Sequence, residues 1–98
     1  MSESVLEIVE FRISGDFEHL YQAARNMEQW LQAQRGFRWR RLSWLEDGTL
    51  IDVIEWDDMA SAKAAADQIM TAEPVAGFIA LIEGSSVIMR HASIAVSQ

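Results

Sequence analysis

The chain has 98 residues, a formal net charge of −7 at pH 7 and no cysteine. Without cysteine it has no disulfide, thiol nucleophile or thiolate metal site. The acidic balance argues against a nucleic-acid partner, because phosphates attract a basic surface.

The length predicts one domain over residues 1–98, since domains typically run ~100–150 residues. Hydrophobic residues make up 50% of the chain, which favours an oligomer for a protein this small. The first residues lack the basic and apolar regions of a signal peptide. The longest uncharged apolar run, residues 74–82, is far shorter than the ~18 residues of a membrane span. We therefore expect a cytoplasmic protein that does not enter a membrane.

Residues 5–13 are expected to form a β-strand, whose successive side chains point to opposite faces of the sheet. Val9 and Phe11 share one face with Glu7, whereas Leu6 and Ile8 share the other. Both faces carry apolar side chains at the start, which is typical of a central strand.

A helix follows, with Asp16 as its expected N-cap. Its apolar residues recur at the three-and-four spacing of one helical face: Phe17, Leu20, Tyr21, Ala24, Met27 and Leu31. Gly36 supplies the C-terminal stop, so one continuous helix is predicted up to that glycine.

Residues 37–45 predict a second strand, and Asp47-Gly48 turns it back into a third strand that ends at Trp56. Four of the eight basic residues gather around the second strand: Arg35, Arg38, Arg40 and Arg41. They indicate either an anion site or an edge strand protected by charge, and the protected edge is favoured because natural edges are commonly protected this way.

Asp57 and Asp58 are expected to cap a second helix over residues 59–71, with a buried stripe of Met59, Ala62, Ala66, Ile69 and Met70. Residues 75–82 predict a short extra turn that carries Phe78. A last strand is expected over residues 87–95.

The order strand, helix, strand, strand, helix, strand predicts an α+β, ferredoxin-like βαββαβ fold. Its four-stranded antiparallel sheet would have the order 4-1-3-2, with the helices on one face. The helix-free face would expose the apolar side chains of Leu6, Ile8, Ile51 and Val53. A second copy packed sheet to sheet would cover them, so we expect a homodimer.

Several passages together resemble the dimeric α+β barrel proteins, and most closely the antibiotic-biosynthesis-monooxygenase-like family. They are residues 7–12, Trp30-Leu31 to Arg35-Gly36-Phe37, residues 47–56 and the alanine-rich second helix. The resemblance covers nearly the whole chain. It implies a homodimeric barrel with a pocket in each subunit between sheet and helices, and for some members a cofactor-free oxygenase acting on polycyclic phenols.

The family pattern transfers to this sequence only in part. The tryptophan that ends the third strand in oxygenases and haem degraders matches Trp56. The asparagine that phenol-oxidising members place four residues earlier is Asp52 here. The first strand lacks the asparagine of haem degraders, and residues 70–82 lack their histidine, so haem degradation is not expected.

Antiparallel pairing would bring Glu7, Asp52, Trp56 and His91 together on the helix-facing side of the sheet. Carboxylates and an imidazole in an apolar pocket suit proton abstraction from a phenol or enol. We therefore predict Asp52 and His91 as catalytic residues and Glu7, Trp56 and Phe78 as substrate-binding residues. The alternative is a structural network in which His91 bonds to a carboxylate.

No cofactor or metal is expected, because the only two histidines lie far apart and no phosphate-binding loop is present. The sequence thus predicts a cofactor-independent monooxygenase-like enzyme for a planar hydrophobic substrate of phenol or quinol type. The alternative is a non-catalytic dimeric module that binds a small ligand or only assembles.

Overall fold

The computed structural model describes residues 3–98. Its elements in chain order are β1 (Val5–Phe11), α1 (Phe17–Asn26), α2 (Glu28–Gln32), β2 (Phe37–Trp44), β3 (Leu50–Trp56), α3 (Met59–Ile69), the 3₁₀ turn η1 (Glu73–Val75), α4 (Ala76–Leu81), the 3₁₀ turn η2 (Gly84–Ser86) and β4 (Ile88–Ser93).

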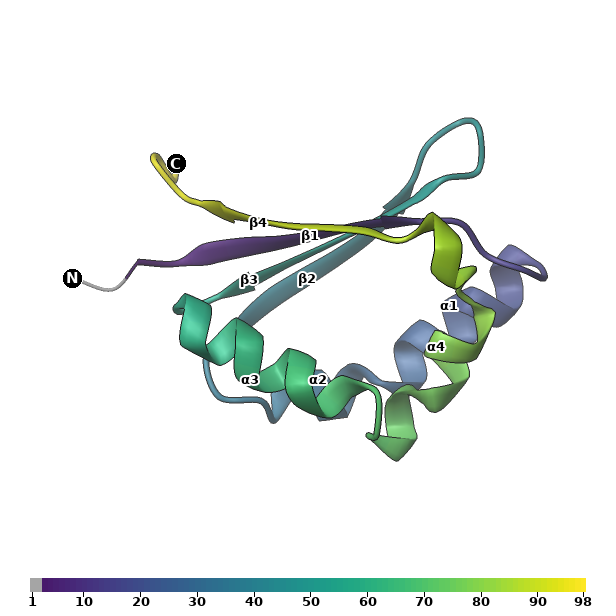
Figure 1. Ribbon diagram of the computed structural model, residues 1–98, viewed down its shortest axis with the longest axis horizontal. Coiled ribbons are helices and arrows are strands. Elements are labelled where there is room, and N and C mark those ends of the chain that lie inside the picture. The colour runs from purple at the N-terminus through teal and green to yellow at the C-terminus, as the bar shows by residue number, and fades with distance from the viewer. Residues whose placement is uncertain (1–2) are drawn as a thin grey trace.

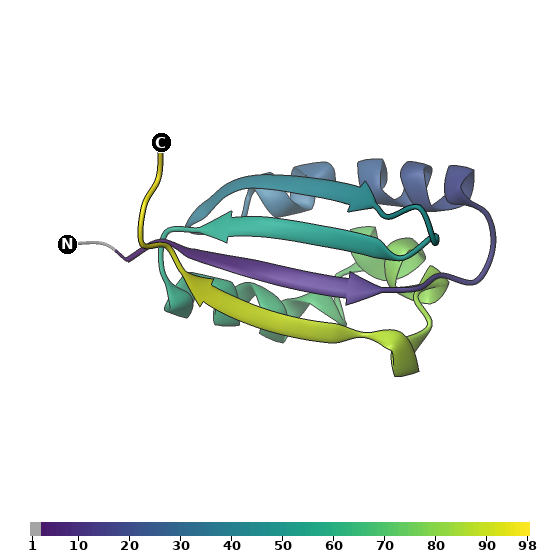
Figure 2. The same ribbon diagram turned by 90° about the horizontal axis from the view of Figure 1, so that it is seen from above.

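The four strands form one antiparallel sheet in the order β2-β3-β1-β4, which is the predicted order read from the other edge. All helices lie on one side of it (Figure 1). From above, α1 and α2 run along the β2 edge, and α3 runs along the β4 edge (Figure 2). The expected ferredoxin-like α+β fold is confirmed.

The strand bounds are close to the predicted ones, and the differences lie at the ends. β1 stops at Phe11, and Ile13 forms only an isolated bridge with Ile82. β4 begins at Ile88 rather than at residue 87, and it ends at Ser93.

Aspartates cap α1 and α3 as predicted, and at α3 the cap is Asp58 rather than Asp57. Asp16 accepts a hydrogen bond from the His19 N–H at 2.9 Å, and Asp58 accepts one from the Ser61 N–H at 2.8 Å. Each carboxylate thereby satisfies an otherwise unpaired N–H of the first helical turn.

The prediction of one continuous first helix is wrong. Met27 has ψ near 1°, outside the helical region, and separates α1 from α2. Its side chain is buried, as are those of Leu20 and Leu31. The apolar spacing therefore continues across a break that the spacing alone does not reveal.

Helix α3 approaches the sheet with its smallest residues. Ser61, Ala62 and Ala65 are its buried side chains, whereas Ile69 is only partly buried. The prediction that Met70 is buried is wrong, because α3 ends at Ile69 and Met70 is 71% exposed.

A β-bulge changes the start of β2. The register of β2 on β3 shifts between Phe37 and Trp39, so that Phe37 lies opposite Trp56 and Trp39 opposite Glu55. The sequence alternation predicted that Phe37 and Trp39 share a face. The extra residue instead turns Phe37 toward the helices, where its ring meets that of Trp56 edge-on at 5.8 Å.

The hydrophobic core fills the space between the sheet and the helices. Its largest fully buried side chains are those of Trp56, Phe11, Leu20, Met27, Leu50 and Val75. On the opposite face, the predicted dimer residues Leu6, Ile8, Ile51 and Val53 remain partly exposed, and no helix covers them. Within residues 3–98, no helix has the length and hydropathy needed to cross a membrane.

Leu20→Ala tests the core assignment. The Leu20 side chain is 0% exposed, so its truncation should lower the free energy of unfolding by ~2–5 kcal/mol through lost burial and a residual cavity. Leu45→Ala is the matched control, because Leu45 is 46% exposed and its truncation should cost little. Chemical denaturation measures both, and a Leu20→Ala cost below about 1 kcal/mol would show that this helix face is wrongly assigned.

Candidate functional site

A groove of about 810 Å³ lies between the helices α1 and α2 and the edge strand β2. Its walls combine aromatic rings, aliphatic side chains and three arginines. The lining residues are Phe17, Tyr21, Ala24, Arg25, Glu28, Leu31, Gln32, Phe37, Arg38, Trp39, Arg40, Leu42 and Trp44.

Strand and helix periodicity place these side chains. Arg40, Leu42 and Trp44 alternate along β2 and therefore project from the same face of the sheet. Phe17, Tyr21 and Ala24 lie three and four residues apart on α1 and face that strand.

Two aromatic rings form the rim at one end of the groove. Phe17 and Trp44 meet edge-on, with their ring centroids 4.9 Å apart. They remain 44% and 63% exposed respectively. Exposed rings of this size at a groove mouth are typical of a surface that receives an apolar ligand.

A buried ion pair lies at the base of the groove. The Arg40 Nε donates to Asp52 Oδ1 at 2.9 Å, and its Nη2 donates to Oδ2 at 2.6 Å. The Arg40 and Asp52 side chains are only 11% and 7% exposed. This two-point contact of guanidinium with carboxylate is the strong geometry for such a pair.

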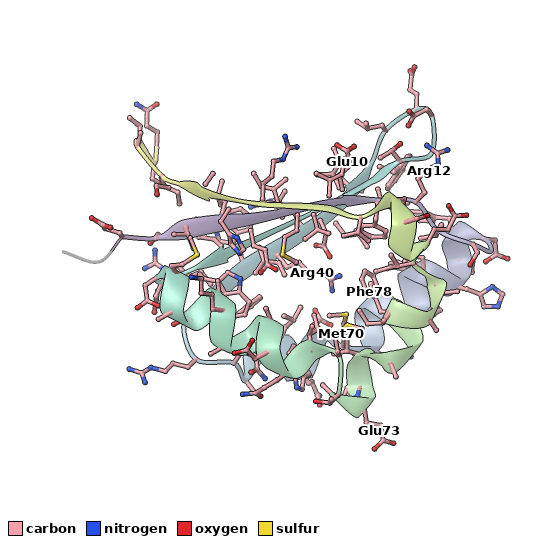
Figure 3. The ribbon with its side chains drawn as sticks, in the orientation of Figure 1. Glu10, Arg12, Arg40, Met70, Glu73 and Phe78 are labelled. Carbon is pink, nitrogen blue, oxygen red and sulfur yellow. The ribbon has the colours of Figure 1, made fainter. Side chains whose placement is uncertain are left out.

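Phe78 supports the same arginine from the helix side. The Arg40 guanidinium carbon lies 4.9 Å from the centre of the Phe78 ring. Figure 3 shows Arg40 projecting from the sheet toward the helices and Phe78 projecting from α4 toward it. The cation thus lies between a carboxylate and an aromatic face.

A second polar contact is buried farther along the sheet. The Trp56 Nε1–H donates to Glu7 Oε1 at 2.9 Å, and both residues are buried. Burial raises the pKa of the Glu7 carboxyl above its ordinary value of 4.5. The Trp56 hydrogen bond and His91 oppose that rise, and the Asp52 carboxylate adds to it.

The strand register explains how these groups meet. Arg40 lies opposite Ile54, Ile54 opposite Glu7, and Glu7 opposite His91. Directly opposed residues share a face of the sheet, so one row of side chains runs across the helix-facing side from β2 to β4.

The five predicted site residues therefore fall into two groups. Asp52 and Phe78 meet at Arg40. Glu7 and Trp56 are bonded to each other, and His91, which is exposed, lies next to Glu7 in register. None of the five lines the groove itself, and their catalytic and binding roles stay predictions.

Arg40 is the residue that the sequence interpretation missed. It was grouped with its neighbours as charge protection for an edge strand. Arg38 fits that description, since it pairs with Glu55 at 3.1 Å and with Asp57 at 2.8 Å. Arg40 instead faces inward. The Asp47-Gly48 turn could have revealed it, because that turn fixes a register in which Leu42 opposes Asp52 and Arg40 lies diagonal to it.

No group of three or more histidine, aspartate or glutamate side chains within residues 3–98 is arranged to hold a metal ion. The Asp52 carboxylate, a possible metal ligand by type, accepts hydrogen bonds from Arg40 instead.

No protein-family model matches the chain. No curated protein matches it either. Solved structures do resemble it. SnoaB, a cofactor-independent oxygenase from Streptomyces nogalater, aligns with a TM-score of 0.73 and 16% identity over 99% of this chain and 96% of that one.

Two further structures extend the comparison. A putative antibiotic biosynthesis monooxygenase from Chloroflexus aurantiacus J-10-fl aligns with a TM-score of 0.71 and 11% identity, over 97% of this chain and 96% of its own. A dimeric ferredoxin-like protein of unknown function from Jannaschia sp. CCS1 aligns with a TM-score of 0.68 and 9% identity, over 93% and 99% respectively.

At these sequence identities the comparisons establish the fold alone, and all three structures have the same fold. The resemblance noted in the sequence is confirmed at that level: the chain has the ferredoxin-like α+β fold of the antibiotic-biosynthesis-monooxygenase-like proteins.

Proposed function

We propose that this protein is a homodimeric, cofactor-independent monooxygenase-like enzyme that binds a planar hydrophobic phenol or quinol in the groove beside β2. The observation that carries the proposal is the groove itself. It has a volume of about 810 Å³, it is lined by aromatic rings, and the guanidinium of Arg40 is held at its base. The cofactor-independent oxygenase among the structures of the same fold supports it.

The proposed reaction needs only the substrate and dioxygen. A phenol with an unsubstituted ring carbon is oxidised to a quinone: one oxygen atom of dioxygen becomes the new carbonyl oxygen, and the other leaves as water with the two hydrogens that the phenol loses. Electron transfer to dioxygen is easier from a phenolate than from a phenol. A cation at the groove base stabilises that phenolate, because charge is stabilised most by preorganised partners.

The predicted residues take different roles in this proposal. Asp52 and Phe78 act as positioning residues, because both act through Arg40. Both oxygens of Asp52 already accept hydrogen bonds, and neither Glu7 nor His91 lines the groove. We therefore assign the phenol proton to solvent in the groove, while Trp56 orients the Glu7 carboxyl beside it in the sheet. The exposed His91 would connect that carboxyl to solvent.

A non-catalytic ligand-binding module is the second candidate. The favouring observation is that the two buried carboxylates on the helix-facing side of the sheet are already engaged, Asp52 by Arg40 and Glu7 by Trp56. Paired buried groups of this kind also occur in purely structural networks.

An activity measurement separates the two candidates. Anthrone, a planar tricyclic phenol tautomer, should raise the melting temperature, and the protein should consume dioxygen and form anthraquinone from it. Ala24→Phe places a ring in the groove and should lower turnover by about tenfold or more by displacing the substrate. Gln22→Phe adds the same ring to an exposed position of α1 outside the groove and should leave turnover unchanged.

Two other outcomes of the anthrone experiment would reject one or both candidate functions. Stabilisation by anthrone without oxygen uptake would favour the binding module over the enzyme. If anthrone changes neither melting temperature nor oxygen concentration, the groove is not a site for flat aromatic molecules and both candidates fail.

The homodimer is proposed through the helix-free sheet face, and the dimeric neighbour of the same fold supports it. Sedimentation should show a dimer at micromolar concentration. Ile8→Glu should shift it to a monomer, because burying a charge in an apolar interface is costly. The new carboxylate would lie opposite Arg90, so the monomer keeps a favourable cross-strand neighbour. A parent protein that sediments as a monomer would rule out this interface.

The raised pKa of Glu7 gives a pH prediction. The folded protein binds the Glu7 proton more tightly than the unfolded chain does, so this stabilising contribution is complete below pH 4.5 and is lost as pH rises through the folded-state pKa. Glu7→Gln keeps an acceptor for Trp56 but cannot ionise. The variant should therefore be more stable than the parent at pH 7, and the difference should shrink on acidification toward pH 4.5. Thermal melts across this range test it, and a difference that does not vary with pH contradicts it.

A further inference from the structure

We propose that Arg40 is a preassembled receptor for an anionic oxygen, so that the groove selects planar aromatic ligands that carry a carboxylate or a phenolate. This inference rests on the proposed function of the groove and narrows the chemical class of its ligand.

The guanidinium of Arg40 is fixed before any ligand arrives. Two of its three nitrogens are committed to Asp52, Nε at 2.9 Å and Nη2 at 2.6 Å, and the Phe78 ring lies 4.9 Å from its central carbon. A planar guanidinium that Asp52 holds along one edge and Phe78 covers on one face has little freedom to rotate. A ligand that binds it therefore loses little affinity to ordering the receptor.

The third nitrogen is available. Among residues 3–98, no acceptor takes a hydrogen bond from Arg40 Nη1. In the same part of the chain no side-chain nitrogen or oxygen is buried without a partner, so Nη1 must contact solvent. Because Arg40 lines the groove, we infer that these free N–H groups face a ligand bound there.

The surroundings favour a ring attached to that anionic group. Leu31, Phe37 and Leu42 line the groove with apolar surface, and Trp44 supplies an exposed ring at the rim. A flat aromatic body would bury this surface while its anionic oxygen reached Nη1.

Two other charged residues of the groove are weaker candidates for the same role. Arg25 donates to the Tyr21 hydroxyl at 3.1 Å, but its side chain is exposed, so water competes for its charge. Glu28, also exposed, repels anions from the α2 side. The remaining groove arginine, Arg38, is half-exposed and already paired with Glu55 and Asp57. Among the charged residues that line the groove, Arg40 combines burial, a fixed orientation and a free donor.

The test compares two ligands of nearly equal shape, 2-naphthoate and the neutral 2-naphthamide, by calorimetry on the parent protein. We expect the carboxylate to bind about tenfold to hundredfold more tightly, which is the effect of one charge-assisted hydrogen bond. The double variant Arg40→Leu/Asp52→Leu replaces the whole pair with apolar side chains, a change that buried pairs often tolerate without loss of stability. It should bind both ligands with the affinity that the parent has for 2-naphthamide.

Arg25→Gln is the matched control, because it removes a groove arginine that has no buried partner, and it should keep the preference for 2-naphthoate. Absorbance titration of bound 2-naphthol provides a spectroscopic readout. Its pKa should be lower on the parent than on the double variant if Arg40 also binds phenolates, and unchanged if the receptor accepts carboxylates alone.

Three results would overturn the assignment. They are equal binding of the two naphthalene ligands to the parent, a preference that survives in Arg40→Leu/Asp52→Leu, and a preference that disappears in Arg25→Gln. Each of these leaves the groove as a binding site for flat molecules. If neither ligand binds the parent, the groove function fails, and the anion receptor fails with it.

Discussion

The bidentate contact between Arg40 and Asp52 is the interaction on which the helix-facing side of the sheet depends. Asp52 lies in the middle of β3, between Leu50 and Ile54 on the same face. A buried carboxylate without a partner would cost several kcal/mol. Arg40 from the neighbouring strand offsets that cost through two short hydrogen bonds. Loss of one partner would leave the other charge buried and uncompensated, with an expected cost of ~3–5 kcal/mol.

This pair separates two regions between the sheet and the helices. Toward the β1 and β4 side the packing is close and includes the buried side chains of Phe11, Phe78 and Trp56, and the Trp56 indole donates a hydrogen bond to the buried Glu7 carboxyl. Toward β2 the helices α1 and α2 leave the groove. The polar groups lie near the boundary, where they can bond to one another, and this is why burial does not leave them unsatisfied.

The sequence predicted the fold well because its strongest signals are local. Alternating strands, the caps Asp16 and Asp58, and the Asp47-Gly48 turn all act within a few residues, and the strand order follows from right-handed connections. The predictions that failed concern backbone irregularities, which the amino-acid composition does not reveal. The break at Met27 preserves the apolar spacing of the two helices. The bulge at the start of β2 moves the Phe37 side chain to the opposite face of the sheet from the one that the regular alternation predicts.

For the site, the sequence identified the polar residues of the sheet but not their partners. Asp52 was recognised as costly to bury, and Glu7, Trp56 and His91 were placed on its face. The assignment of Arg40 to edge protection hid the residue that satisfies Asp52, because only the register fixed by the Asp47-Gly48 turn distinguishes Arg40 from the outward-facing arginines near it. The family resemblance implied a pocket between sheet and helices, but the lining and position of the groove could not be inferred, since they depend on how α1 and α2 lie along the β2 edge (Figure 2).

The way Arg40 is neutralised also governs how an anion would reach the groove. At a distance, the guanidinium charge is cancelled by the Asp52 carboxylate, while the whole chain carries a net charge of −7. Beyond a screening length of ~8–10 Å an approaching anion therefore meets no attraction. Capture would rely on random encounter and on the fit of a large, poorly hydrated ring. Small, strongly hydrated anions such as phosphate or sulfate, which have no apolar surface to bury, would gain nothing from the encounter.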